Sequence, residues 1–179
     1  MTTIQALFPP RLPQQTSDEN VVVNWAKNAT LAPAQAVATP ENEAQLQQII
    51  AAASGRVRVM GSRMSPGRML KLSEPGDTLI DLSRLRGVLA VTDESVTFAA
   101  GTVLHEVFET LTSMNRMLHA SPGVIDSQTL AGAVSTGTHG QGMGQSSLAD
   151  EALAIRLIDA HGEAHDIERD DAAFDAAQQ

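Results

Sequence analysis

The stretch VRVMGSRMSPG, Val57 to Gly67, joins a predicted strand to a turn rich in small residues. The apolar residues from Val57 to Met60 predict a short buried strand. Gly61 and Ser62 end this strand, and Arg63 adds a cation directly after them. Backbone amides and one positive charge are therefore expected to gather at the strand end, as in many phosphate sites. The stretch leads to the hypothesis of a phosphate-bearing cofactor.

The segments around this stretch predict a small parallel α/β lobe. Thr39 and Pro40 predict the start of a helix, with proline at its first position. The helix has an apolar stripe of Leu46, Ile49, Ile50 and Ala53. A strand at 57–60 and a second strand at 78–82 follow it, and this alternation is typical of α/β folds.

The segments further along predict a second lobe with antiparallel strands and helices. Residues 87–101 form two β runs around a polar turn at 93–95, which predicts a hairpin. Thr102 is a candidate cap for a helix whose apolar face is Leu104, Val107, Phe108 and Leu111. A further hairpin is predicted at 151–168, turning at 161–163. The predicted class is α+β, with an N-terminal extension at 1–24 and lobes at about 25–90 and 91–179.

Composition excludes several classes of protein. The 179 residues carry 12 basic and 21 acidic side chains, and this net charge of -9 argues against binding to nucleic acid or to an anionic membrane. The chain has no cysteine, so disulfides, thiolate metal sites and cysteine nucleophiles are excluded. No secretion signal is visible, and no apolar stretch approaches the ~20 residues needed to span a bilayer. The sequence predicts a soluble, cytoplasmic protein.

A second glycine-rich stretch, TLAGAVSTGTHGQGMG, extends from Thr129 to Gly144. Its side chains are small or hydroxylic, so a flat ligand or a phosphate could approach the backbone closely. The alternative is a simple glycine-rich connector, although two such stretches in one small chain make that less favoured. Neither stretch contains the dinucleotide fingerprint G-x-G-x-x-G or a P-loop.

Together with NWAKNATLAPAQAVATPENEAQLQQII at 24–50, the two glycine-rich stretches resemble the PCMH-type FAD-binding domain of the vanillyl-alcohol-oxidase superfamily. The resemblance is closest to the alditol oxidases and to the gulonolactone and arabinonolactone oxidases, and it covers the chain from about Trp25 to its end. It implies a two-lobed domain that binds FAD. It also implies an oxidoreductase that acts on a CH–OH group of a sugar alcohol, an aldonolactone or a similar substrate.

The resemblance assigns cofactor binding to residues of both stretches and of the segment between them. In the family, the first loop wraps the FAD pyrophosphate, and the small-residue stretch lines the cofactor further along. For His139, a structural hydrogen bond to the backbone is an equally good interpretation. The predicted cofactor-binding residues are Val59, Met60, Gly61, Ser62, Arg63, Met64, Ser65, Ser121, Asp126, Thr129, Ala133, Val134, Ser135, Thr136, Gly137 and His139.

The first loop departs from the family pattern at two positions. Met64 stands where the family has the histidine that links to flavin, and a thioether cannot form that bond. FAD is therefore expected to bind noncovalently. Arg63 replaces a glycine of the family pattern, and it either blocks the close approach of the cofactor or pairs with its pyrophosphate.

The part of the family pattern that carries the substrate domain and most catalytic groups is absent, so no catalytic residue is assigned. A second polypeptide that supplies this domain, a chain cut from a longer one, a relic, and self-association all remain open. The rival hypothesis is a non-catalytic interaction subunit that has lost its flavin. A hydrolase is disfavoured because no G-x-S-x-G elbow is present. No metal site is predicted, because His161 and His165 flank Gly162 in a predicted hairpin.

Overall fold

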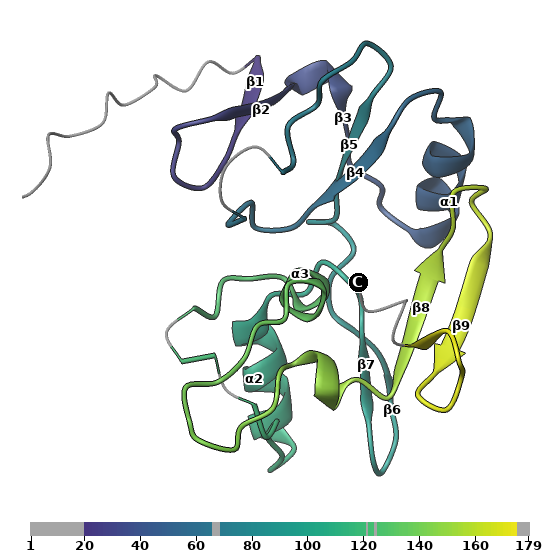
Figure 1. Cartoon of the computed structure of the whole chain (residues 1–179). Coiled ribbons are helices and arrows are strands. Elements are labelled where there is room, and N and C mark those ends of the chain that lie inside the picture. The colour runs from purple at the N-terminus through teal and green to yellow at the C-terminus, as the bar shows by residue number, and fades with distance from the viewer. Residues whose placement is uncertain (1–19, 66–68, 121, 124, 175–179) are drawn as a thin grey trace, which may run out of the picture.

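The computed structural model describes residues 20–65, 69–120, 122–123 and 125–174. Its elements form two lobes, with β1 to β5 and α1 in the first and the remaining elements in the second (Figure 1). Each lobe has its own cluster of buried hydrophobic residues. This mixed architecture confirms the predicted α+β class. The predicted N-terminal extension lies mostly outside the described residues, as do Pro66, Gly67 and Ser121.

A three-stranded parallel sheet forms the centre of the first lobe, in the order β3-β5-β4. Strand β3 is Val37–Ala38, β4 is Val57–Met60 and β5 is Thr78–Asp81. The central strand is the most deeply buried, because Leu79 and Ile80 have no exposed surface. β4 and β5 confirm the strands predicted at 57–60 and 78–82. Their parallel register pairs Met60 with Asp81, so both strands end at the same edge of the sheet.

An antiparallel hairpin of β1 (Val21–Val23) and β2 (Thr30–Pro33) extends the first lobe. Its second strand contributes Leu31 and Ala32 to a buried cluster with Met60 and Leu79. A short 3-10 helix, Ala34–Ala36, leads from β2 to β3. β1 lies within the segment predicted as an extension, and its register with β2 ties that part of the segment to the lobe.

Helix α1 is Glu43–Ala52, so it begins later than Thr39 and Pro40 predicted. Its N-cap is Asn42, whose side-chain oxygen accepts a hydrogen bond from the Gln45 amide at 3.0 Å. Asn42 satisfies an amide that would otherwise lack a partner, so a strong cap lies three residues beyond the predicted one. The predicted stripe residues are all partly buried rather than fully buried.

The second lobe contains the hairpin of β6 (Val88–Val91) and β7 (Val96–Phe98) and the helices α2 (Leu104–Ser113) and α3 (Leu130–Ser135). The hairpin and the buried face of α2 confirm the predictions, since Leu104, Val107 and Leu111 are buried. The predicted cap was wrong. The Thr102 hydroxyl donates to the carbonyl of Ala99 at 2.7 Å and accepts from the Gly87 amide at 2.9 Å, so it braces the base of the hairpin.

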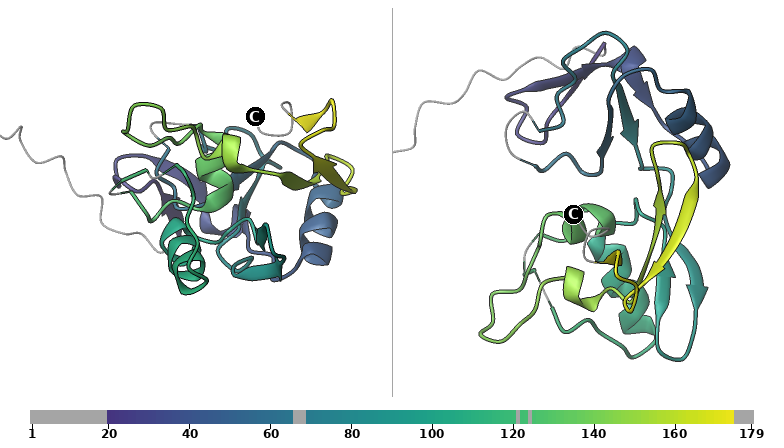
Figure 2. Two further views of the ribbon diagram at one scale, coloured as in Figure 1. Left: turned by 90° about the horizontal axis from the view of Figure 1, so that it is seen from below. Right: turned by 45° about the vertical axis from the view of Figure 1, so that its right-hand side comes forward.

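The hairpin of β8 (Ala154–Ile158) and β9 (Ala164–Glu168) runs alongside α1 of the first lobe (Figures 1 and 2). A short 3-10 helix, Ala149–Glu151, precedes it. Its turn lies where the sequence predicted it and contacts α1, because the Gln47 side chain donates to the carbonyl of Gly162 at 3.0 Å. Among the described residues, no helix has the length and apolar character required to cross a membrane.

Candidate functional site

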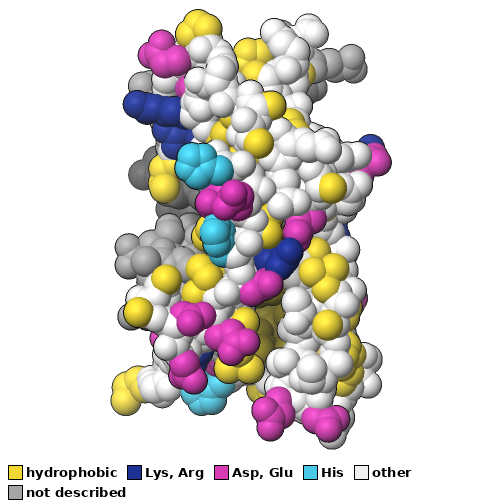
Figure 3. All heavy atoms as spheres, turned by 90° about the vertical axis from the view of Figure 1, so that its right-hand side faces the viewer, with side chains coloured by type: hydrophobic (Ala, Val, Ile, Leu, Met, Phe, Trp, Pro, Cys, Tyr) yellow, Lys and Arg dark blue, Asp and Glu magenta, His cyan; other side chains and the backbone are white. Residues whose placement is uncertain are grey.

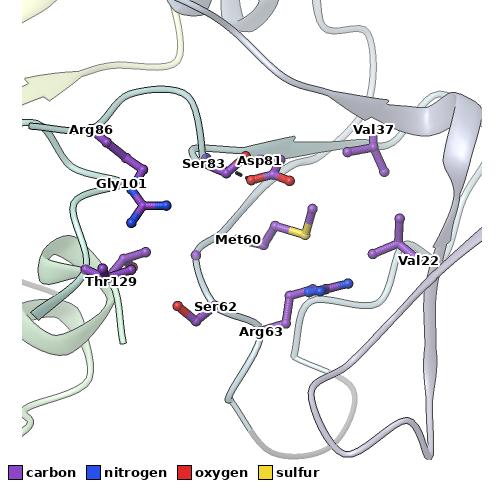
Figure 4. Close-up of a pocket in the computed structure, with 12 residues that line it drawn as sticks. Val22, Val37, Met60, Ser62, Arg63, Asp81, Ser83, Arg86, Gly101 and Thr129 are labelled. Carbon is purple, nitrogen blue, oxygen red and sulfur yellow. Dashed lines mark hydrogen bonds between the residues drawn. The ribbon is translucent and has the colours of Figure 1, made fainter. Parts of the chain in front are cut away.

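A cavity of about 300 Å³ lies where the ends of β4 and β5 face the second lobe (Figure 4). The first lobe contributes the end of β4 and the loop after it, together with Asp81 and Ser83 beyond β5. Gly101, Val103 and Thr129 form the opposite wall, and Arg86 enters from the connection between the lobes. Binding at the carboxyl ends of parallel strands is the general rule for open α/β sheets.

The two glycine-rich stretches meet in this cavity at Gly61 and Thr129. A Cβ atom on Gly61 would lie 2.1 Å from the Thr129 hydroxyl oxygen, so a residue larger than glycine would overlap Thr129. Thr129 itself is buried, and its hydroxyl accepts a hydrogen bond from the Gly132 amide at 3.3 Å as the N-cap of α3. Glycine is therefore required at position 61, because the Thr129 side chain occupies the place of a Cβ atom and the two stretches are in contact there.

The loop after β4 is also tied to the segment that precedes α3. The Ser62 hydroxyl donates to the carbonyl oxygen of Ser127, and the Ser127 hydroxyl contacts the Met64 sulfur at 3.6 Å. The same segment pairs with the start of α2, where the Leu104 amide donates to the carbonyl of Gln128 at 2.9 Å. These contacts hold the loop and the start of α3 in one fixed arrangement.

Arg63 occupies a backbone conformation that favours glycine, with φ of 59°. Its carbonyl accepts a hydrogen bond from the Trp25 amide at 3.1 Å, and its guanidinium donates to the carbonyl of Val23 at 3.2 Å. Within the described residues, the amides of Ser62 and Arg63 have no hydrogen-bond acceptor. Free amides around a residue of positive φ are the elements of a backbone nest that binds anions.

Two charged side chains of the cavity were missed by the sequence analysis. Asp81 accepts a hydrogen bond from the Ser83 amide at 2.8 Å. Arg86 forms a two-point contact with Glu106, from Nε to Oε2 at 3.2 Å and from Nη2 to Oε1 at 2.5 Å. Burial raises the pKa of Glu106, but the hydrogen bonds from Arg86 and from the Val103 amide outweigh it, so the pKa lies below its usual range.

Five of the predicted cofactor residues line the cavity, namely Met60, Gly61, Ser62, Arg63 and Thr129. The other described ones lie outside its lining, at Val59, Met64, Ser65, Asp126, Ala133, Val134, Ser135, Thr136, Gly137 and His139. Ala133 is fully buried in the core of the second lobe, and Val59 is 48% exposed. A ring nitrogen of His139 lies 2.9 Å from the carbonyl oxygen of Gly140, which fits the structural interpretation of this residue.

The cavity lining also contains residues for which the sequence carried no local signal. These are Val22, Val37, Asp81, Ser83, Arg86, Gly101 and Val103. They come from four separate segments, and only the folded chain brings them to the strand ends. The position of Asp81 and Ser83 after the second predicted strand was the nearest available clue, because parallel strands share a carboxyl edge.

A separate group of ionisable side chains lies at the β8–β9 turn, on the face shown in Figure 3. One ligand atom each of Asp159, Glu163 and His165 lies within 4.8 Å of the others. The Asp159 carboxylate accepts from the amides of His161 and Glu163 and contacts the His165 ring at 3.0 Å. The contact with His165 and these amides lower the pKa of Asp159 to about 2. The Asp159 carboxylate therefore makes its hydrogen bonds within the β8–β9 hairpin.

Comparison with known proteins identifies the class. A family model described as FAD binding domain matches residues 34–168. The chain belongs to this family, the PCMH-type FAD-binding domains, and the resemblance found in the sequence is confirmed.

Three relatives are similar to the chain over most of its length. It is 32% identical to an L-gulono-1,4-lactone dehydrogenase of Mycobacterium tuberculosis, over 78% of this chain and 33% of the relative. It is 36% identical to a long-chain alcohol oxidase of an uncultured marine euryarchaeote, over 75% of this chain and 27% of the relative. It is 30% identical to a D-arabinono-1,4-lactone oxidase of Eremothecium gossypii, over 80% of this chain and 28% of the relative. The chain thus spans about a third or less of the length of these relatives.

Two solved structures share the fold. Cholesterol oxidase from B. sterolicum matches with a TM-score of 0.69 at 17% identity, over 94% of this chain and 36% of that one. An alkyldihydroxyacetonephosphate synthase matches with a TM-score of 0.68 at 19% identity, over 79% of this chain and 28% of that one. At such identities the likeness concerns the fold alone.

The cavity fits the anionic part of FAD. The amides of Ser62 and Arg63 and the side chains of Arg63 and Arg86 supply donors for phosphate oxygens. The cavity volume is smaller than a whole dinucleotide requires, so it would hold only a part of the cofactor.

Proposed function

We propose that this chain is the FAD-binding part of a flavin-dependent oxidoreductase that oxidises a CH–OH group of a sugar alcohol, an aldonolactone or a similar substrate. The observation that carries the proposal is the contact of Gly61 with Thr129, which joins both family stretches at one cavity. FAD, when bound, supplies the redox chemistry by accepting hydride from the alcohol carbon. The residues of this chain bind and orient the cofactor.

The substrate class is supported by the names of the relatives, two of which act on aldonolactones and one on a long-chain alcohol. We assign residues 25–179 to the FAD-binding domain, with lobes at about 25–90 and 91–179. Of the extension predicted at 1–24, strand β1 also belongs to the first lobe, because it pairs with β2 and Val22 lines the cavity. No catalytic base is assigned to this chain. We propose that the substrate-binding groups belong to protein outside these residues, carried by a second polypeptide or by a longer form of the chain.

We further propose that FAD is held without a covalent bond. Met64 stands in the loop position where the family has its flavin-linking histidine, and its sulfur contacts the Ser127 hydroxyl. A thioether cannot form a histidyl bond, and the chain has no cysteine that could replace it. FAD released by acid precipitation would support this proposal, and flavin that stays with the precipitated protein would contradict it.

The second candidate is a non-catalytic scaffold that has lost its flavin. The specific observation in its favour is Arg63, whose side chain lines the cavity and is bound to the carbonyl of Val23. In this position it occupies space that a glycine would leave free for a cofactor.

The test is an absorption spectrum of the purified chain, followed by titration with FAD. A noncovalent flavoprotein shows flavin bands at about 370 and 450 nm, or gains them with added FAD. Protein that stays colourless after incubation with FAD and removal of the free cofactor would contradict the proposal and favour the scaffold. The Arg63→Gly variant separates the two interpretations of Arg63, because tighter FAD binding would show that the side chain blocks the site.

A further inference from the structure

Two arginines line the cavity of a chain that is strongly acidic overall. Two arginines and one aspartate line it, whereas the whole chain has a net charge of -9. Arg63 and Arg86 reach the cavity from opposite sides in Figure 4, Arg63 from the loop after β4 and Arg86 from beyond β5. Asp81 and the Glu106 partner of Arg86 balance the two positive charges, so an anion would be held by the directed donors of the arginines and not by a net positive field.

The two arginines differ in how far their donors are already used. The Arg63 guanidinium donates to the carbonyl of Val23. Arg86 uses Nε and Nη2 for Glu106, and no atom of the described residues accepts a hydrogen bond from its Nη1. In Figure 4 the Arg86 guanidinium points into the cavity toward the side of Thr129 and Ser62. Arg86 thus presents a free donor edge to the cavity.

Glu106 holds this guanidinium in place from a rigid support. It lies on α2, which is anchored by the buried side chains of Leu104 and Val107. Its Oε2 atom also accepts a long hydrogen bond of 3.4 Å from the Val103 amide at the start of the helix. An arginine whose planar fork is held in this way loses little conformational entropy when it binds a ligand.

The backbone that carries Arg86 is also fixed. The Gly101 amide donates to the carbonyl of Leu85 at 2.8 Å, and the Gly87 amide donates to the Thr102 hydroxyl at 2.9 Å. Residues on both sides of Arg86 are therefore bound to the segment that precedes α2. The guanidinium is positioned by its backbone and by Glu106 before any ligand arrives.

We propose that Arg86 binds the diphosphate of FAD and that Glu106 is its positioning residue. This inference rests on the proposed function, since it concerns the same cavity. A guanidinium with a free donor edge matches the oxygens of a phosphate group, and the free amides of Ser62 and Arg63 lie in the loop on the other side. The isoalloxazine ring carries no comparable negative charge, so Arg86 acts on the diphosphate alone.

The test measures the affinities of the folded wild-type chain and its variants for FAD, ADP and riboflavin. FAD and riboflavin are followed by flavin fluorescence and ADP by calorimetry. Arg86→Gln is expected to lower the affinities for FAD and ADP about tenfold or more, because a hydrogen bond to a charged group is lost. The affinity for riboflavin is expected to stay unchanged. The matched control is Arg84→Gln, since Arg84 is exposed, pairs with Glu41 and does not line the cavity.

The role of Glu106 is tested by Glu106→Gln and by the double variant. Glu106→Gln keeps the Arg86 charge but loosens its position, so we expect a smaller loss of ADP affinity. The double variant is expected to bind ADP no worse than Arg86→Gln alone, because the two residues act as a unit. Additive losses would overturn the positioning role.

Several outcomes overturn the inference. If Arg86→Gln binds FAD and ADP as tightly as the wild type, Arg86 does not bind the diphosphate, and the proposed function still stands. If the affinity for riboflavin falls by the same factor, the substitution disturbs the structure of the binding site as a whole, and Arg86 has no specific contact with the diphosphate. Wild-type protein that binds no FAD refutes the proposed function as well. Should Arg86→Gln fail to fold, Arg86→Lys keeps the charge without the fork, and an unchanged ADP affinity would refute the inference.

Discussion

The contact between Gly61 and Thr129 at the cavity differs in kind from the contact between α1 and the β8–β9 hairpin on the outer face. At the cavity, backbone meets a buried side chain with no space between them. On the outer face, Arg156 of β8 pairs with Glu43 of α1 and with Asp166 of β9, and all three side chains are about half exposed or more. Both contacts join the first lobe to the second.

The two contacts differ in how well they tolerate amino-acid substitutions. A close approach of buried atoms fails when one atom is added, because the neighbours cannot move away. Exposed ion pairs are screened by water and salt and contribute little to stability. We therefore expect the geometry of the cavity to be more sensitive to substitution than the ion pairs of the outer contact, and four substitutions test this in decreasing order of effect.

The largest effect is expected for Gly61→Ala. The added methyl group would overlap the Thr129 side chain, so the free energy of unfolding should fall by about 1–3 kcal/mol. FAD affinity should fall as well, because the loop must move away from Thr129. Urea unfolding and FAD titration measure the two effects.

A glycine of the same family stretch provides the control for this prediction. A Cβ atom on Gly142 would meet only the flexible side chain of Gln145, so Gly142→Ala should change stability and affinity little. The double variant Gly61→Ala/Thr129→Ala should lose less than the sum of the two single variants. If it loses the full sum, the overlap with Thr129 is not the cause.

A smaller loss of stability is expected for Gly162→Ala at the outer contact. Gly162 has φ of 80°, and a Cβ atom there would lie 2.6 Å from the carbonyl oxygen of Gln47. Backbone strain and this overlap should lower the free energy of unfolding by about 1–2 kcal/mol. FAD affinity should stay at the wild-type value under conditions in which the variant is folded. A matching loss of FAD affinity would show that the two contacts are not independent.

A loss in the free energy of unfolding smaller than that of Gly162→Ala is expected for Arg156→Gln, because its ion pairs with Glu43 and Asp166 are exposed to solvent. The difference from the wild type should shrink further in 0.5 M salt, about threefold above ordinary ionic strength. The measurement is urea unfolding at two salt concentrations, with Arg156→Lys as the charge-conserving control. A loss larger than that of Gly162→Ala would reverse the expected order.

The smallest effect is expected for Asp159→Asn, and it should depend on pH. The pKa of Asp159 is lowered to about 2 by its contact with His165 and by backbone hydrogen bonds. A carboxyl whose pKa is lower in the folded state stabilises the fold above its unfolded pKa of about 4. This contribution is lost as the pH falls through 2, so thermal unfolding of variant and wild type should converge between pH 4 and 2. A constant difference across that range would contradict the assignment.

Much of the local structure could be predicted from the sequence, because it depends on residues close together in the chain. The strand at 57–60 ends directly before Gly61, and the face of α2 with Leu104, Val107 and Leu111 repeats with helical spacing. The turn at 161–163 carries glycine where φ is positive. In contrast, the helix caps at Thr39 and Thr102 were predicted wrongly. Asn42 caps α1 in place of Thr39, and the Thr102 hydroxyl donates to the carbonyl of Ala99 after β7.

The sequence by itself determined the family, the two glycine-rich stretches and five of the residues that line the cavity. These follow from local patterns, in which residue type and spacing carry the information. Only the tertiary structure decided that Gly61 abuts Thr129 and that Arg86, held by Glu106, points into the same cavity. The physical reason is that a contact between residues far apart in the chain depends on how the lobes pack, and no local pattern records that packing.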